Sequence, residues 1–418
     1  MIVPTALQRL TRDGWLLFAT RFIRLFAYGS LSVVLVFYLI AIGLSPRQTG
    51  MLLTLTLAGD IVVSLFLTTR ADRIGRRRML MVGAVLMAAA GVAFASTRSL
   101  WLLVVAGTIG VISPSGNEVG PFLSIEQAAL SHVVTDRTRT EVFAWYTLAG
   151  SVATALGALA AGTAVRFMRD ATATPVSSYR AVVLLYAVLG LILAALFSRL
   201  SRTAEATTFG EKKAFQATFA GLSGLDRSRD VVLRLSALFA LDSFGGGFVI
   251  QSFAAYWFYL RFGVDPATLG VIFFWANVFA GISAVLASRL AARFGLIRTM
   301  VGTHLPSNVL LILVPLMPTL PLAIGVLLLR FSISQMDVPT RQSYIMAVVV
   351  EEERSAAAGI TGVARTVGAA ISPVFVGFMF ARPGLISLPF FIAGTLKIVY
   401  DLLLYRAFVA VQPPEERR

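Results

Sequence analysis

The stretch Arg70-Ala71-Asp72-Arg73-Ile74-Gly75-Arg76-Arg77-Arg78-Met79-Leu80 lies between two long apolar segments. It holds five arginines within nine residues, a density of charge that the interior of a lipid bilayer does not admit. Lysine and arginine in short loops beside membrane spans are retained on the cytoplasmic side. We therefore expect a tight cytoplasmic hairpin between two spans, from which the orientation of every other span follows.

The composition of the whole chain is that of an integral membrane protein. Its 418 residues are 57% hydrophobic and 14% charged, whereas soluble domains are about half apolar and a quarter charged. The net charge of +15 is divided among loops and forms no continuous basic face, so we expect no nucleic acid partner. The chain has no Cys and two His, too few for a disulfide framework or a histidine-built metal site. We expect neither a metal nor another cofactor.

Twelve apolar runs are long enough to cross a bilayer, because a spanning helix needs about 20 residues. They lie at about 14–43, 48–69, 79–96, 101–132, 141–165, 181–198, 230–260, 267–288, 299–315, 320–349, 355–381 and 386–405. Lysines and arginines on the side of the hairpin outnumber those on the other side by about three to one. We expect an all-α polytopic protein of the plasma (inner) membrane with both termini in the cytoplasm.

The longest polar interruption divides the chain into two six-span halves. We expect an N-terminal half over 1–199, a cytoplasmic linker over 200–229 and a C-terminal half over 230–418. Within the linker, Thr208 and Glu211 have the spacing of a capping box, and Phe215, Phe219 and Leu222 recur at helical intervals. This pattern predicts an amphipathic helix on the inner membrane surface.

The two halves repeat one another. A shift of 220 residues places Pro46 and Gly50 on Pro266 and Gly270, and it places Arg73, Gly75 and Arg78 on Arg293, Gly295 and Arg298. The matched residues are mostly polar or turn-forming, which argues against chance matching of apolar helices. Two six-span repeats in the same order are typical of secondary transporters.

Six plus six spans, a long central loop and the basic hairpin together resemble the major facilitator superfamily (MFS). Its signature, Gly-x-x-x-Asp-Arg-x-Gly-Arg-Arg, is matched at Asp72, Arg73, Gly75, Arg76 and Arg77, with Thr68 in place of the leading Gly. The resemblance implies the MFS fold of two pseudo-symmetric six-helix bundles and transport of a small molecule by alternating access. Drug/proton antiporters of the superfamily usually carry a Gly-Pro pair in span five, where this chain has glycines without the proline.

The resemblance also implies a role for the hairpin. In the superfamily its Asp meets the positive N-terminal end of span eleven, which here lies near Arg354. The second copy of the hairpin has Ala292 in place of the Asp, so it lacks this interaction. We therefore expect a one-sided conformational latch made by Asp72, Arg73, Gly75 and Arg76.

Charged residues within spans are candidate functional residues, because each costs at least about 2.5–3.5 kcal/mol near the bilayer centre. Cations and carboxylates balance in number, with Arg21, Arg24, Arg330, Arg341, Arg365 and Lys397 on one side and Asp60, Glu118, Glu126, Asp242, Asp337 and Asp401 on the other. The candidates for proton coupling are Asp60, Glu118, Glu126 and Asp242. The candidates for substrate binding are Arg24, Arg330, Asp337, Arg341 and Arg365.

Helical spacing predicts partners for several of these charges. On a continuous span ten, Arg330, Asp337 and Arg341 would share one face. Asp337 and Arg341 are four residues apart and can pair, which leaves Arg330 for another partner. The same spacing predicts a structural pair between Lys397 and Asp401 on span twelve.

The first half offers the expected proton carrier. A carboxylate held ionised by an arginine takes up a proton when that arginine is drawn away. We expect Glu118 or Asp60 to do this, whereas Glu126 and Arg21 could form a structural gate pair. On span seven, Asp242 is followed by Gly245, Gly246 and Gly247, which predict either a bending gate or close helix packing.

No phosphate-binding loop of the Gly-x-x-x-x-Gly-Lys-Ser/Thr type is present, and no catalytic constellation is visible, so we expect a transporter and not an enzyme. The first hypothesis is proton-coupled efflux of an amphipathic or drug-like compound. The second is transport of an anionic metabolite, with intramembrane arginines as its ligands. The third is a transport-dead membrane sensor. The expected partners are a small-molecule substrate, protons and the lipid bilayer, and the expected state is a monomer.

Overall fold

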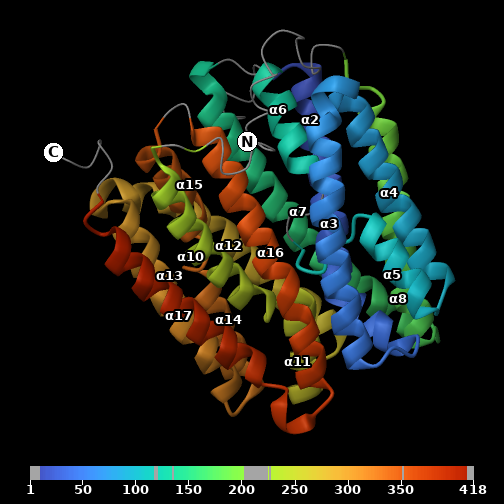
Figure 1. The fold of residues 1–418 in the computed structure, drawn as a ribbon. Helices are drawn as coiled ribbons and strands as arrows, with labels where there is room; N and C mark the ends of the chain where they lie inside the picture. Colours follow the sequence, from blue (N-terminus) through green and yellow to red (C-terminus); the bar gives the residue numbers. More distant parts are fainter. Residues whose placement is uncertain are drawn as a thin grey trace, which may run out of the picture. The chain divides into compact units, whose positions relative to one another are not determined.

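The computed structural model describes residues 10–116, 121–133, 136–201, 225, 227–350 and 353–411. Within these ranges the chain consists of helices joined by turns, without a strand, which confirms the all-α fold class (Figure 1). The amphipathic helix predicted around Thr208 to Leu222 lies outside the described residues, as does Glu118.

The first half of the chain supplies seven of the described helices. They are α2 (Arg12–Ala41), α3 (Pro46–Ile74), α4 (Arg76–Ser96), α5 (Leu100–Ile109), α6 (Phe122–Val133), α7 (Asp136–Asp170) and α8 (Pro175–Phe197). Each predicted span of this half coincides with a helix, except that span four is divided between α5 and α6. The sequence Ser113-Pro114-Ser115-Gly116 interrupts it, because Pro lacks a backbone N–H and Gly116 adopts a φ of 72°.

The second half supplies α10 (Arg229–Gly247), α11 (Gln251–Phe262), α12 (Pro266–Phe294), α13 (Leu296–Leu313), α14 (Leu320–Phe331), α15 (Asp337–Val348), α16 (Arg354–Phe380) and α17 (Leu388–Phe408). Short 3₁₀ turns, η3 (Val314–Leu316) and η5 (Pro383–Leu385), follow α13 and precede α17. Among the described residues, ten helices are long and apolar enough to cross a membrane, and two shorter apolar helices, α5 and α14, begin spans four and ten.

Span ten is two helices, which corrects the prediction of one continuous face. The chain leaves the helix after Phe331 and re-enters it at Asp337. Pro339 explains the restart, because in an uninterrupted helix its ring would clash with the carbonyl of Gln335, whereas it is tolerated in the first turn of α15. The N–H of Gln335 donates instead to Ser283 Oγ at 3.3 Å, so this freed backbone group has a side-chain partner.

The repeat of the two halves is visible in the backbone. A single glycine joins α3 to α4 and another joins α12 to α13, and both adopt positive φ, 115° at Gly75 and 84° at Gly295. Residues with a Cβ are strained in this region. The shift of 220 residues therefore pairs two positions with the same conformational requirement.

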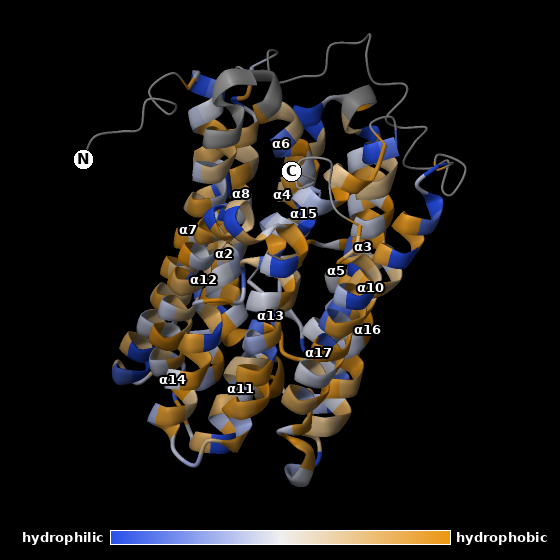
Figure 2. Ribbon diagram, turned by 90° about the vertical axis from the view of Figure 1, so that its left-hand side faces the viewer, coloured by the Kyte–Doolittle hydropathy of each residue, from blue (hydrophilic) through white to orange (hydrophobic). Residues whose placement is uncertain are grey.

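The described residues divide into two compact units. Unit 1 lies within Met1–Phe209 and Gln251–Phe274, and unit 2 lies within Gly210–Ile250 and Trp275–Arg418. Figure 2 shows hydrophobic residues along most of the helices of both units, with hydrophilic residues mainly near helix ends and at a few positions within helices. In unit 1, α2 packs along α7 and α4 along α8. In unit 2, α10 packs along α16, and α13 and α10 both pack along α17.

Small residues permit these close helix pairs, as is common in membrane proteins. In unit 1, a Cβ placed on Gly157 of α7 would lie 2.1 Å from the carbonyl oxygen of Phe26 on α2. The Ser30 hydroxyl donates to the carbonyl of Gly157 at 3.0 Å across the same contact. In unit 2, a Cβ on Gly368 of α16 would lie 2.3 Å from the carbonyl oxygen of Ala240 on α10.

We predict that Gly157→Ala destabilises unit 1, because the new methyl group meets backbone that must move. Overpacking of this kind costs about 1–3 kcal/mol. The matched control is Gly359→Ala on α16, where a Cβ meets nothing within 4 Å. Thermal unfolding of the purified protein in detergent measures both; equal unfolding temperatures for the two variants would contradict the packing.

Candidate functional site

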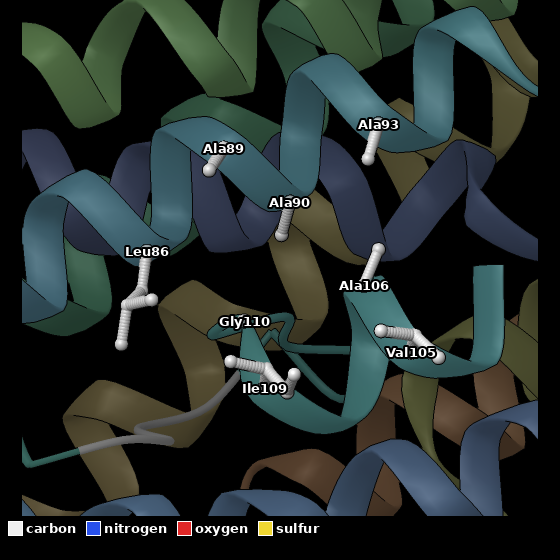
Figure 3. A pocket seen from close by; sticks show the side chains of 8 residues that line it. All are labelled: Leu86, Ala89, Ala90, Ala93, Val105, Ala106, Ile109 and Gly110. Carbon is white, nitrogen blue, oxygen red and sulfur yellow. The ribbon is translucent and has the colours of Figure 1, made fainter. Parts of the chain in front are cut away.

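A pocket of about 220 Å³ lies between α4 and α5, but its chemistry argues against a polar substrate. Figure 3 shows side chains of α4 facing those of α5, and the eight residues that line it are Leu86, Ala89, Ala90, Ala93, Val105, Ala106, Ile109 and Gly110. These side chains provide neither a charge nor a hydrogen-bond donor. The buried charged residues are therefore the better candidates for a functional site.

The densest group of buried charges lies in unit 2 around Asp242 of α10. Lys397 of α17 donates to Asp242 Oδ1 at 2.6 Å, and Arg341 of α15 donates to Asp242 Oδ2 at 3.1 Å. Arg341 also donates to Asp337 at 2.6 Å, which confirms the predicted pair on α15. We call the following residues the Asp242 cluster: Asp242, His304, Asn308, Asp337, Arg341, Lys397 and Asp401.

His304 of α13 extends this cluster to a third carboxylate. Its Nδ1 lies 2.8 Å from Asp401 Oδ1, and its Nε2 lies 3.8 Å from Asp242 Oδ1. Asn308, one turn further along α13, donates to Asp401 Oδ2 at 2.9 Å. Four helices, α10, α13, α15 and α17, thus contribute to one connected network.

Helical spacing explains how the cluster is assembled. Three of its helices each contribute two members four residues apart, which therefore lie on the same helix face. These pairs are His304 with Asn308, Asp337 with Arg341, and Lys397 with Asp401. The partners of each pair, however, lie mostly on other helices.

The glycines of α10 give Lys397 its route to Asp242. A Cβ on Gly245 would lie 3.2 Å from Lys397 Cγ, and one on Gly246 would lie 3.6 Å from Lys397 Cε. Gly247 packs against α16, where a Cβ would lie 2.6 Å from the carbonyl oxygen of Ala369. Close packing therefore accounts for Gly247 and Gly245, whereas a Cβ on Gly246 would make an ordinary van der Waals contact.

The predicted pair between Lys397 and Asp401 is wrong. Lys397 pairs with Asp242, and Asp401 pairs with His304 and Asn308. The i, i+4 rule considers one helix alone, whereas these buried groups find closer partners on neighbouring helices. His304 and Asn308 were not among the predicted site residues. The available signal is an imidazole and an amide side chain one turn apart within a predicted span.

The charged side chains of the cluster must be paired because they are buried. Asp242 is 4% exposed, Arg341 is 4% exposed and Asp401 is fully buried. An isolated ion in such surroundings costs several kcal/mol, and attraction between ions together with hydrogen bonds offsets this cost. Each carboxylate of the cluster accordingly contacts at least one donor.

Two further guanidinium groups flank the cluster without a carboxylate ligand. Arg330, at the end of α14, and Arg365, on α16, make no ion pair with any described residue. The Nε of each is buried and without a hydrogen-bond partner in the part of the chain that is described. Both lie within electrostatic range of Asp242 and Asp337, and Arg365 also lies near Arg341. Ser334, in the break of span ten, has a buried hydroxyl that lacks a partner among the same residues.

Unit 1 holds a separate buried ion pair. Arg24 of α2 binds both carboxylate oxygens of Glu126 on α6, at 2.7 and 2.8 Å, and both side chains are fully buried. The hydroxyls of Thr20 and Tyr146 also donate to Glu126. The Arg21 guanidinium lies 4.4 Å from the centre of the Tyr146 ring. The structure thus brings Arg24 and Glu126 together.

The remaining predicted site residues lie on α3 and at the hairpin. Asp60 on α3 is 5% exposed, with the Ser64 hydroxyl 3.5 Å from its carboxylate. Asp72 and Arg73 lie in the last turn of α3, and Gly75 forms the junction to α4. Arg76 is buried and donates to the carbonyl of Ala128 at 3.3 Å.

We predict that Asp242→Asn destabilises the protein by about 3–5 kcal/mol, because it leaves a buried lysine without its counter-ion. The double variant Asp242→Asn/Lys397→Met removes both charges and should recover much of this loss. Asp170→Asn is the control, because Asp170 and its partner Arg166 are 74% exposed and such pairs contribute little. Thermal unfolding in detergent checks the prediction, and a double variant no more stable than the single one would contradict it.

The chain was compared with known proteins. A family model described as the Major Facilitator Superfamily matches residues 17–334 and 240–418. The uncharacterized membrane protein YJR124C of Saccharomyces cerevisiae is 32% identical over 426 residues, which cover 96% of this chain and 95% of that protein.

Solved transporters share the fold. The nucleoside transporter NupG, as its D323A mutant, has a TM-score of 0.76 at 11% identity and covers 95% of this chain and 100% of its own. The D-xylose-proton symporter has a TM-score of 0.71 at 16% identity, covering 94% and 97%. The human organic anion transporter MFSD10 (TETRAN) has a TM-score of 0.60 at 16% identity, covering 96% and 100%. The family model shows that this chain belongs to the major facilitator superfamily, a family of secondary transporters.

Proposed function

We propose that this protein is a proton-coupled transporter that carries a small organic anion by alternating access. The observation that supports the proposal is the pair of guanidinium groups, Arg330 and Arg365, that have no carboxylate partner among the described residues. By contrast, Arg341 and Lys397 of the same unit are ion-paired. The solved transporters are at most 16% identical to this chain, so the substrate class rests on these side chains.

A carboxylate is the anion that suits these arginines. The planar guanidinium presents its N–H donors in a fork that matches the two oxygens of a carboxylate. An arginine within a span is costly when it is unpaired, so a bound carboxylate would supply a missing counter-ion. The unpartnered hydroxyl of Ser334 would add a neutral donor to the same region.

The paired residues have a different proposed role. Glu126 accepts from Arg24, Thr20 and Tyr146, so we propose that Arg24 and Glu126 hold α2, α6 and α7 together and bind neither proton nor substrate. Asp337 and Arg341 are likewise ion-paired with one another. Arg330 and Arg365 remain from the predicted substrate ligands, and Asp60 and Asp242 remain from the described candidates for proton coupling.

A second candidate is efflux of an amphipathic, drug-like compound. Phe244, Phe248 and Phe375 form an aromatic group in unit 2, with ring centres 5.2 to 6.3 Å apart. Phe375 is 44% exposed, so this group presents an apolar surface that a drug-like molecule could contact. Such a compound need not be an anion, which separates the two candidates in a transport assay.

The membrane orientation and the division of the chain are part of the same proposal. We propose that the protein lies in the plasma membrane with both termini in the cytoplasm, as the excess of basic residues on that side indicates. The 200–229 segment would link the two six-span halves, 1–199 and 230–418. The hairpin residues Asp72, Arg73, Gly75 and Arg76 would act as the conformational latch.

We predict that purified protein in liposomes takes up at least one member of a panel of small mono- and dicarboxylates but not its neutral amide. Arg330→Gln and Arg365→Gln should each lower that uptake about ten-fold or more, because each removes a charged hydrogen bond to the substrate. Arg382→Gln, at an exposed arginine, is the control and should transport normally.

The same assay contains the outcomes that would contradict the proposal. Transport of neutral or cationic amphipathic compounds, unaffected by either arginine variant, would favour the second candidate. Absence of transport for the whole panel would favour a membrane sensor. A pH difference imposed across the liposome should drive the anion uphill, and the sign of that difference distinguishes symport from antiport.

A further inference from the structure

His304 has no role in the ion pairs of Arg341 and Lys397 and is not one of the proposed anion ligands. It is 5% exposed and lies between two carboxylates, with Nδ1 at 2.8 Å from Asp401 and Nε2 at 3.8 Å from Asp242. Its ring also meets the ring of Tyr400 edge to face, with the centres 5.8 Å apart. Histidine is the side chain best suited to gain and lose a proton near neutral pH.

The neighbours of the ring determine which nitrogen is free to take a proton. An ionised Asp401 can only accept, so the short contact requires a hydrogen on His304 Nδ1. Asn308 also directs its amide nitrogen to Asp401, so its 3.2 Å approach to Nδ1 joins two donors and is not a hydrogen bond. Nε2 is therefore the nitrogen that can be bare, and it faces Asp242.

The ring of His304 lies between two carboxylates of the cluster, Asp401 and Asp242. Among the directly paired groups, the carboxylates of Asp242, Asp337 and Asp401 outnumber the cations Arg341 and Lys397 by one, and Arg330 and Arg365 flank the cluster. An imidazolium at His304 would give Asp401 a cationic partner. The ionisable groups that interact electrostatically within and around the cluster, besides His304, are Asp242, Arg330, Asp337, Arg341, Arg365, Lys397, Tyr400 and Asp401.

We propose that His304 carries the coupled proton, which it takes up on Nε2 so that the imidazolium joins Asp242 of α10 to Asp401 of α17. Asp401 is a positioning residue that fixes the tautomer through Nδ1. This inference rests on the proposed function, because it assigns the proton of that transport cycle to a residue. It places the coupling site in unit 2 and not at Glu118 or Asp60.

The same arrangement links the proton to the anion. A carboxylate bound by Arg330 or Arg365 adds negative charge beside the cluster and so favours the protonated state of His304. By reciprocity, a protonated His304 increases the affinity for the anion by the same factor. Proton and anion then bind together, and release of the proton weakens the hold on the anion.

The protonation state can be measured without a substrate. The chain has two histidines, so the variant His132→Gln leaves His304 as the only imidazole. Nitrogen NMR of this variant, labelled with ¹⁵N-histidine and held in nanodiscs, should show the Nδ1–H tautomer at alkaline pH and the imidazolium on acidification. Asp401→Asn should give a mixture of tautomers, whereas the control Asp170→Asn should leave the spectrum unchanged. A ring that stays neutral down to the lowest pH at which the protein remains folded would overturn the inference.

Transport then tests coupling separately from binding. His304→Gln should retain exchange of the transported carboxylate across liposomes at equal pH but lose its accumulation against a gradient when a pH difference is imposed. Retained uphill accumulation in that variant would overturn the role of His304 even if arginine-dependent anion transport holds. If the wild type moves no anion, the proposed function fails by itself, and the NMR experiment still decides whether His304 takes a proton.

Discussion

Burial of charge within membrane-spanning helices is the constraint on which the rest of unit 2 depends. Asp242 lies in the interior of a helix bundle and holds Lys397 and Arg341 at hydrogen-bond distance. Lys397 depends on it for its counter-ion, because an unpaired ion in this environment costs more than the packing around it recovers, whereas Arg341 also pairs with Asp337. Pairs of polar residues on three helices meet this requirement. The cluster thus joins four helices and holds buried charges between them.

The arginines within the spans differ in whether they have a carboxylate partner among the described residues. Arg341 contacts two carboxylates and Arg24 contacts both oxygens of one, so a substrate would have to break existing bonds to reach them. Arg330 and Arg365 have no such bond among the described residues. A transported anion would supply the counter-ion that these arginines lack among the described residues, which would favour its binding. A change in the local charge would then weaken that binding.

The sequence predicts those features that arise from local physics. The basic hairpin, the glycine junctions and the pair of Asp337 with Arg341 depend on neighbours within a few residues, and the structure contains each of them. The partner of Lys397 could not be predicted in this way, because Asp242 is 155 positions away and meets it only through helix packing. The break in span ten depends on Pro339. The apolar run with periodic polar residues around it predicts one continuous helix instead. The spacing of His304 and Asn308 indicates a polar helix face, but it does not predict that Asp401 of another helix is their shared partner.

The most direct test of the account is whether carboxylates bind at Arg330 and Arg365. A ligand that binds the folded protein alone raises its unfolding temperature by mass action. Thermal unfolding of the detergent-purified protein should therefore be measured with each carboxylate of the panel and with its neutral amide. Stabilisation is expected from at least one carboxylate and not from its amide, and it should be lost in the double variant Arg330→Gln/Arg365→Gln. Equal stabilisation by acid and amide, or an effect that survives in the double variant, would contradict it.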